Sequence, residues 1–91
     1  EVENILNGHP AVLEVAVIGV PHERWGETPR AVVVLRTGMH ATEQALIEYT
    51  RERLAHYKCP TSLVFTQTLP RNASGKLLKR ELRLTQKAQI A

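Results

Sequence analysis

The first half of the chain shows one helical pattern followed by two strand patterns. In EVENILN, apolar residues spaced one helical turn apart predict a short amphipathic helix over residues 1–7, and Gly8 is well placed to end it. The stretch VLEVAVIGV (Val12–Val20) alternates and is rich in β-branched residues, which predicts a strand. The continuous apolar run in RAVVVLR (Arg30–Arg36) predicts a second, central strand. The turn residues of GVPHERWGETP separate the two, so we expect paired strands joined by a long loop.

The second half of the chain predicts two more helices and a third strand. Thr42 suits the N-cap of a helix that continues to about Ala55, and SLVFTQ (Ser62–Gln67) predicts the third strand. LPRNASGK is expected to be a loop, and TQKAQIA a frayed tail. The last helix is marked by three apolar residues at helical spacing, Leu77, Leu78 and Leu82. The order αββαβα predicts an α+β domain, with a small three-stranded sheet flanked by helices.

The composition is that of one small globular domain. The 91 residues are 43% apolar and 23% charged, which is ordinary for a globular chain of one domain. No apolar run approaches the roughly 20 residues of a membrane span, so no membrane-spanning segment is expected. The single cysteine, Cys59, cannot form an internal disulfide, and we therefore expect a reducing, cytoplasmic location.

Positive charge is concentrated at the C-terminal end. Residues 1–75 carry seven Lys or Arg against eight Glu, whereas residues 76–91 carry five against one Glu, within a net charge of +3. A basic terminus is usually a solvated face or tail, but it can also bind nucleic acid, phosphate or a membrane surface. Charge alone leaves both interpretations open.

Metal binding and covalent catalysis are only weakly indicated. His56 and Cys59 have the spacing of half a metal site, but no second pair of ligands accompanies them, so no metal site is predicted. The chain contains no Asp for a serine triad, and Cys59 is more typical of a semi-buried structural thiol than of a nucleophile. Trp25, the only tryptophan, lies in the polar stretch HERWGETP. It could cover a small core, or it could be a stacking surface for a nucleotide or an apolar tether.

Lys76 is the strongest candidate for chemistry, because it directly follows Gly75 at the expected start of the last helix. The pair does not belong to a phosphate-binding P-loop, since Pro70 stands where that motif needs glycine and Leu77 where it needs Ser or Thr. What remains is a flexible loop with one ammonium group near a helix N-terminus, which suits an anion whose charge must be stabilised during a reaction. A solvated lysine at a helix start stays the alternative.

Several stretches together resemble one family. LPRNASGKLLKRELR (Leu69–Arg83) resembles the C-terminal signature of the adenylate-forming enzymes, which include acyl-CoA synthetases, adenylation domains of peptide synthetases and luciferases. EVENILNGHPAVLEVAVIGVPHERWGETPRAVVVL and LAHYKCP resemble earlier parts of the same C-terminal domain, in the same order. The resemblance predicts a C-terminal lid domain over residues 1–83 and a flexible tail over residues 84–91. The signature is more similar to that of acyl-CoA synthetases than to that of peptide synthetases.

The resemblance implies a part of a larger enzyme. Such an enzyme is an ATP-dependent ligase that converts a fatty acid or another carboxylate and Mg-bound ATP to an acyl-adenylate. It then passes the acyl group to the thiol of CoA or of a carrier protein. A large N-terminal domain binds ATP and the carboxylate, and the mobile lid presents a different face in each half-reaction. The fragment alone is expected to be inactive and to bind no cofactor tightly.

The resemblance also assigns roles to individual residues. Lys76 matches the catalytic lysine of adenylate formation, and Gly75 allows its loop to bend. Four residues are expected along the path of the thiol and near the CoA nucleotide: Trp25, Gly26, Tyr57 and Lys58. The lid interpretation predicts no nucleic-acid partner. Two alternatives remain, namely a small basic module that binds nucleic acid or another polyanion, and a structural interaction domain.

Overall fold

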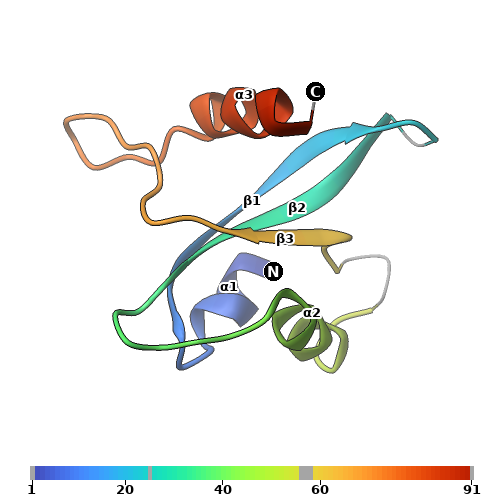
Figure 1. Ribbon diagram of the computed structural model, residues 1–91, viewed down its shortest axis with the longest axis vertical. Helices are drawn as coiled ribbons and strands as arrows, with labels where there is room; N and C mark the ends of the chain where they lie inside the picture. The colour runs from blue at the N-terminus through green and yellow to red at the C-terminus, as the bar shows by residue number, and fades with distance from the viewer. Residues whose placement is uncertain (1, 25, 56–58, 91) are drawn as a thin grey trace.

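The computed structural model describes residues 2–24, 26–55 and 59–90, with the backbone alone at residues 22 and 86–90. A three-stranded sheet in the order β1-β2-β3 has helices on both faces (Figure 1). The elements in chain order are α1 (Val2–Asn7), β1 (Val12–His22), β2 (Gly26–Leu35), α2 (Glu43–Arg51), β3 (Ser62–Phe65) and α3 (Lys79–Ile90). This arrangement confirms the predicted α+β fold with the order αββαβα. Within the ranges given, no helix is long and apolar enough to cross a membrane.

The sheet is built on a long hairpin of β1 and β2. The two strands pair antiparallel and end with His22 opposite Gly26, which leaves only residues 23–25 as their connection. The prediction of a long loop at GVPHERWGETP is therefore wrong. Its turn-forming residues pair with one another across the hairpin, with Pro21 opposite Glu27, so they extend both strands. Gly26 takes a left-handed φ of 78° where the short connection joins β2.

Strand β3 completes the sheet on the other side of β2. It pairs parallel with residues 30–33, and helix α2 lies in the crossover that a parallel connection requires. The sequence pattern placed the end of β3 at Gln67, but the strand ends earlier, at Phe65. The amide of Thr66 still donates to the carbonyl of Val33 in β2 (2.9 Å), and its hydroxyl donates to the carbonyl of Thr68 (3.3 Å).

The sheet is buried on both faces, and β2 contributes to both cores. Val32 and Val33 are consecutive in β2, point to opposite faces and are fully buried, which confirms the prediction of a central strand. Helices α1 and α2 cover one face, and α3 with the segment before it covers the other (Figure 1). The first core contains Val2, Leu6, Val12, Val15, Ala31, Val33, Leu46 and Leu63. The second contains Ala16, Ile18, Val20, Val32, Val34, Leu69 and Leu82.

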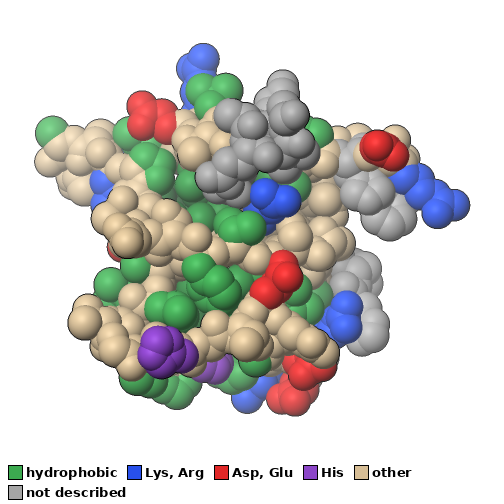
Figure 2. Space-filling model, in the orientation of Figure 1, with side chains coloured by type: hydrophobic (Ala, Val, Ile, Leu, Met, Phe, Trp, Pro, Cys, Tyr) green, Lys and Arg blue, Asp and Glu red, His purple; other side chains and the backbone are tan. Residues whose placement is uncertain are grey.

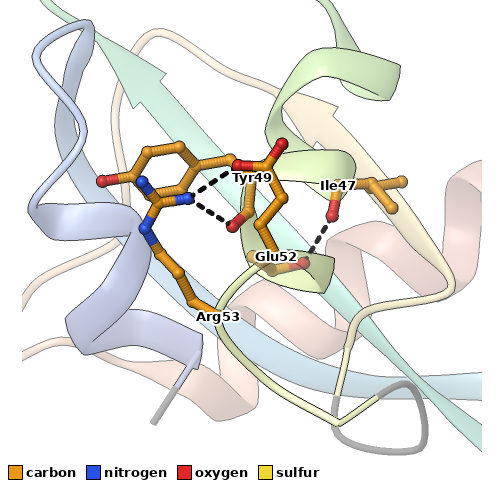
Figure 3. Close-up of polar contacts among 5 residues, drawn as sticks. Ile47, Tyr49, Glu52 and Arg53 are labelled. Atoms are coloured by element: carbon orange, nitrogen blue, oxygen red, sulfur yellow. Dashed lines mark hydrogen bonds and ion pairs between the residues drawn. The ribbon is translucent and has the colours of Figure 1, made fainter.

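Helix α2 is capped at both ends by side chains. The Thr42 hydroxyl accepts a hydrogen bond from an amide of the first turn (3.1 Å), which confirms Thr42 as the N-cap. The helix ends at Arg51 rather than at about Ala55. The guanidinium of Arg53 folds back over the Tyr49 ring, 3.6 Å from its centroid, and donates to the Tyr49 carbonyl (3.0 Å) (Figure 3). In a continuing helix the amide of Arg53 would take that carbonyl. Here this amide donates to the carbonyl of Thr50 instead (3.0 Å), and the Arg53 side chain caps the carbonyl that is left.

Helix α3 begins at Lys79, later than the leucine pattern predicted. The reason is that the residues before it hydrogen-bond to an earlier part of the chain; the amide of Leu78 donates to the carbonyl of Pro70 (2.9 Å). At its other end α3 continues to Ile90, so the backbone of residues 84–90 is helical where a frayed tail was expected. The flexibility of this end stays a prediction.

Both outer edges of the sheet are blocked by a glutamate from a helix. Glu3 of α1 accepts a hydrogen bond from the amide of Val17 in β1 (2.9 Å). Glu43 of α2 accepts one from the amide of Leu63 in β3 (2.9 Å). Because β1 and β3 are the edge strands, their unpaired amides would otherwise invite pairing with another chain. Each carboxylate therefore protects one edge.

Leu46 of α2 tests the assignment of the first core. Its side chain is fully buried, so Leu46→Ala should lower the free energy of unfolding by about 2–5 kcal/mol, through lost burial and a cavity. Leu84→Ala is the matched control, because it is the same substitution in a helix at a residue that is 62% exposed. The control should change stability by less than about 0.5 kcal/mol. Urea unfolding followed by circular dichroism measures both variants, and equal midpoints would contradict the burial of Leu46.

Candidate functional site

Lys76 lies on a small hairpin loop between β3 and α3. Arg71 and Leu77 form a β-bridge at the base of this loop, and the amide of Asn72 donates to the carbonyl of Lys76 (3.0 Å). The amide of Gly75 donates to the carbonyl of Asn72 (2.9 Å), which closes the turn at the tip. Lys76 is exposed, and α3 begins only beyond the loop. The expectation that Lys76 stands at a helix N-terminus is therefore wrong.

The side chain of Asn72 organises the inside of the loop. Its Oδ1 accepts hydrogen bonds from the amides of Ser74 and Lys76, both at 2.9 Å. Asparagine closes turns in this way because its short amide reaches the backbone two residues further on. These two amides are occupied, so the group that Lys76 offers to an anion is its ammonium. Sequence reasoning missed Asn72, although an asparagine three residues before a glycine is a recognisable turn signal.

Gly75 takes a backbone conformation that favours glycine. Its φ is 83°, in the left-handed region, and a Cβ added to it would meet no other atom within 4 Å. Glycine is therefore favoured here by the backbone torsion angle, and not by a lack of space for a side chain. The geometry accounts for glycine directly before Lys76, while a contact of Gly75 with a substrate stays a prediction.

Arg71 ties this loop to the sheet. Its Nη1 donates to the carbonyl of Gly75 (2.9 Å), and its Nη2 forms an ion pair with the Glu14 carboxylate in β1. One guanidinium thus joins the tip of the loop to a strand. Sequence reasoning singled out neither Arg71 nor Glu14, because they are 57 positions apart and only the fold brings them together.

The other predicted site residues are not brought next to Lys76. Gly26 is exposed at the start of β2, in the turn that connects β1 to β2. Figure 1 shows this turn and the orange loop that carries Lys76 at opposite ends of the molecule. Trp25, Tyr57 and Lys58 lie outside the described residues, so their expected roles along the thiol path and near the CoA nucleotide stay predictions.

Cys59 has the environment of a structural thiol. It is buried, and its Sγ lies 3.5 Å from the carbonyl oxygen of Ala55. His56, the other member of the possible metal half-site, lies outside the described residues. In the part of the chain that the structure describes, no three His, Cys, Asp or Glu side chains are grouped closely enough to hold a metal ion.

A shallow apolar groove lies at the end of β2 and β3, and Lys76 is not among the residues that line it. Its volume is about 420 Å³, and it is lined by Val34, Leu35, Thr37, Phe65, Thr66 and Gln67. Figure 2 shows hydrophobic side chains gathered across the middle of the visible face, with most of the visible Lys and Arg side chains toward its rim. Lys76 does not line this groove and stands on an exposed loop instead. An anion that reacts at Lys76 would need a second surface to hold it.

Comparison with known proteins places the chain in a family. Residues 1–76 match the AMP-binding enzyme C-terminal domain family, and the chain belongs to it. The predicted resemblance to the C-terminal domain of the adenylate-forming enzymes, of the acyl-CoA synthetase type, is thereby confirmed.

The relatives are much longer proteins. Probable acyl-activating enzyme 22 of Arabidopsis thaliana is 48% identical over 101 residues, which cover 100% of this chain and 19% of the relative. The peroxisomal benzoate–CoA ligase of the same plant is 47% identical over 94 residues, covering 91% and 16%. Among solved structures, the Mycobacterium tuberculosis fatty acyl CoA synthetase matches with a TM-score of 0.91 and 45% identity, over 98% of this chain and 18% of that one. ATP-bound MatB from Rhodopseudomonas palustris matches with a TM-score of 0.92 and 38% identity, over 99% and 18%. The chain thus spans less than a fifth of the length of these relatives.

Gly75 tests whether the loop depends on a left-handed residue. Gly75→Ala should lower the free energy of unfolding by about 1–2 kcal/mol, because an L-residue is strained at this φ. Gly75→Asn should lose less, since asparagine tolerates the left-handed region better. Gly38→Ala is the matched control outside the loop, because Gly38 has a φ of 78° and equally open surroundings, and it should lose as much as Gly75→Ala. A thermal unfolding series measures all three, and an unchanged Gly75→Ala variant would show that the loop does not need this conformation.

Proposed function

We propose that this chain is the mobile C-terminal lid domain of an ATP-dependent acyl-CoA synthetase. The full enzyme would convert a carboxylate and Mg-bound ATP to an acyl-adenylate and then form a thioester with CoA. Membership of the AMP-binding enzyme C-terminal domain family supports this proposal, as do relatives whose names describe CoA ligases. The single observation that carries it is the hairpin loop that presents Lys76 with its side chain exposed.

Lys76 is proposed to act in the first half-reaction. Attack of a carboxylate on ATP brings two anions together, and negative charge develops at the reacting phosphate. An ammonium group between them would orient the attack and offset the repulsion, an effect worth a few kcal/mol for a preorganised donor. The loop suits this role because the amides of Ser74 and Lys76 are already occupied by Asn72, which leaves Nζ as the charged group on offer.

The second half-reaction is proposed to use the opposite end of the domain. Gly26 lies in the turn between β1 and β2, far from the Lys76 loop (Figure 1). Trp25 and Gly26 would line the path of the thiol, and Tyr57 with Lys58 would lie near the CoA nucleotide. The lid would therefore turn between the two half-reactions.

The rest of the machinery would belong to a partner domain. An exposed lysine needs a surface that holds ATP and the carboxylate, and the relatives have room for such a domain in the four-fifths of their length that this chain does not match. The isolated chain is therefore expected to be inactive, with no tightly bound cofactor. The acceptor could be the thiol of CoA or of a carrier protein, and the acyl group is expected to come from a fatty acid or another carboxylate.

The alternative of a small basic module that binds nucleic acid is less well supported. Family membership favours the ligase domain. One of the basic residues at the C-terminal end, Lys79, is already paired with Glu3 inside the domain (3.1 Å between Nζ and Oε2). We propose a cytoplasmic location on the basis of the free thiol of Cys59. A peroxisomal location is the alternative, since the name of the benzoate–CoA ligase relative includes it.

The assignment of Lys76 is tested in the full-length enzyme. Lys76→Ala should slow acyl-adenylate formation by about 10²–10³-fold, because a preorganised charge at the reacting phosphate is lost. Conversion of supplied acyl-adenylate to the thioester should change little. Pyrophosphate release and thioester formation are measured separately, by a coupled assay and by chromatography.

Arg83→Ala is the control for a general loss of charge. It removes one exposed positive charge from α3 without touching the loop, and both half-reactions should keep their rates. Equal losses of both half-reactions in Lys76→Ala would contradict the role proposed for Lys76.

A further inference from the structure

The peptide group before Lys76 is held at both of its ends. The carbonyl of Gly75 and the amide of Lys76 belong to this one peptide plane. The carbonyl accepts a hydrogen bond from Nη1 of Arg71 (2.9 Å), and the amide donates to Oδ1 of Asn72 (2.9 Å). Rotation of the plane would break one or both hydrogen bonds, so two side chains fix its orientation.

The peptide group after Lys76 is held as well. Its carbonyl, that of Lys76, accepts a hydrogen bond from the amide of Asn72 (3.0 Å). The two planes that flank a Cα determine its φ and ψ, and these set the direction of the Cα–Cβ bond. The backbone therefore aims the Lys76 side chain in one direction, and only its own torsion angles remain free.

Arg71 can hold the loop only because it is itself held. Its Nη2 forms an ion pair with Glu14 of β1, and its planar guanidinium directs both donors at fixed angles. The pairing of β1 with β2 is irregular between Val12 and Glu14, where β1 has a bulge, and Glu14 is the first residue after it. Its position in the alternation of β1 places it with Ala16 and Ile18, on the face that α3 covers. The bulge therefore directs a carboxylate from the sheet toward the loop.

We propose that Arg71, held by Glu14, and Asn72 are positioning residues that aim Lys76 at the reacting carboxylate and phosphate. The proposal rests on the function proposed for Lys76 in adenylate formation. It assigns to these three residues an action through the backbone of the loop, without contact with the substrate. A small displacement of a catalytic group from its productive geometry can cost about 100-fold in rate, so the aim of Lys76 matters for the chemical step.

The chain provides a matched control for the charge of Glu14. Glu3 is also a glutamate paired with a basic residue near the loop, since it lies 3.1 Å from Lys79 at the start of α3. Glu14→Gln and Glu3→Gln change the net charge equally and weaken one ion pair each. Glu3 also accepts a hydrogen bond from the amide of Val17, which the amide oxygen of glutamine can still accept. Only the Glu14–Arg71 pair is connected to the Lys76 loop, because Arg71 also donates to the carbonyl of Gly75. An effect of Glu14 that is absent for Glu3 is therefore an effect on the aim of the loop.

The experiment uses the full-length enzyme and separates the two half-reactions. Asn72→Ala and Arg71→Ala should each lower kcat for acyl-adenylate formation by about 10–100-fold, with little change in KM for ATP. Glu14→Gln should lower it by a smaller factor, because the hydrogen bond from Arg71 to Gly75 weakens but does not vanish. Asn72→Asp should restore most of the rate, since its carboxylate can accept the same two amide hydrogen bonds. Glu3→Gln should leave kcat unchanged.

Two further measurements keep the outcome clear. Thioester formation from supplied acyl-adenylate should be unchanged in every variant, which shows that the domain is folded. Amide hydrogen exchange at Lys76 should be faster in Asn72→Ala and normal in Asn72→Asp, as expected if Asn72 holds that amide. If Asn72→Ala fails to fold, Arg71→Ala and Glu14→Gln decide, because the first removes and the second weakens the hydrogen bond from Arg71 to the carbonyl of Gly75.

The possible failures can be distinguished. A normal adenylation rate in Asn72→Ala and Glu14→Gln, beside an inactive Lys76→Ala, would overturn the positioning roles and leave the proposed function standing. A Lys76→Ala enzyme that still forms adenylate at the normal rate would overturn the proposed function itself. If Glu3→Gln matched Glu14→Gln in its loss, the effect would be one of general charge, and the proposed route through Arg71 would be wrong.

Discussion

The burial of β2 on both faces is the constraint on which the rest of the structure depends. Its consecutive residues Val32 and Val33 are both fully buried, on opposite sides of the sheet. A strand of this kind needs a neighbour on each edge and a cover on each face. In a chain of 91 residues this requirement engages every element, because a small domain has little other surface to bury. The segment that leads to α3 is therefore required as part of the cover and is not merely a connection.

This requirement places the candidate site. Leu69 before the loop and Leu82 after it are both buried in the core under α3, so the loop is anchored at both ends by packing. Between them the chain is exposed, and hydrogen bonds from Arg71 and Asn72 hold it in place of apolar contacts. Two kinds of interaction thus fix the position of the loop. Packing sets where the loop stands on the sheet, and polar contacts set where Lys76 is directed.

The elements were predictable from the sequence because their patterns reflect burial, whereas their ends depend on contacts that a pattern does not contain. Pro21 and Glu27 look like turn residues, but they pair across a hairpin. Helix α2 ends early, where the amide of Arg53 turns to the carbonyl of Thr50 and its side chain caps that of Tyr49. In the candidate site, Lys76 was singled out by its place after Gly75 and by the resemblance to the family, and Asn72 had a turn signal that was not used. The contact of Arg71 with Glu14 could not be predicted, because the two residues meet only when β1 and the loop are placed on one face of the sheet.

Strand β1 also separates the two ends of the domain by a fixed distance. Glu14, which supports the Lys76 loop, lies near its start, and His22 at its end stands opposite Gly26. A strand rises about 3.3 Å per residue, so these two positions of β1 are roughly 25 Å apart. This separation supports the proposal that Lys76 and the turn at Gly26 act in different half-reactions. Under the proposed function, a lid that uses the Lys76 loop in one half-reaction and the turn at Gly26 in the other must turn between them.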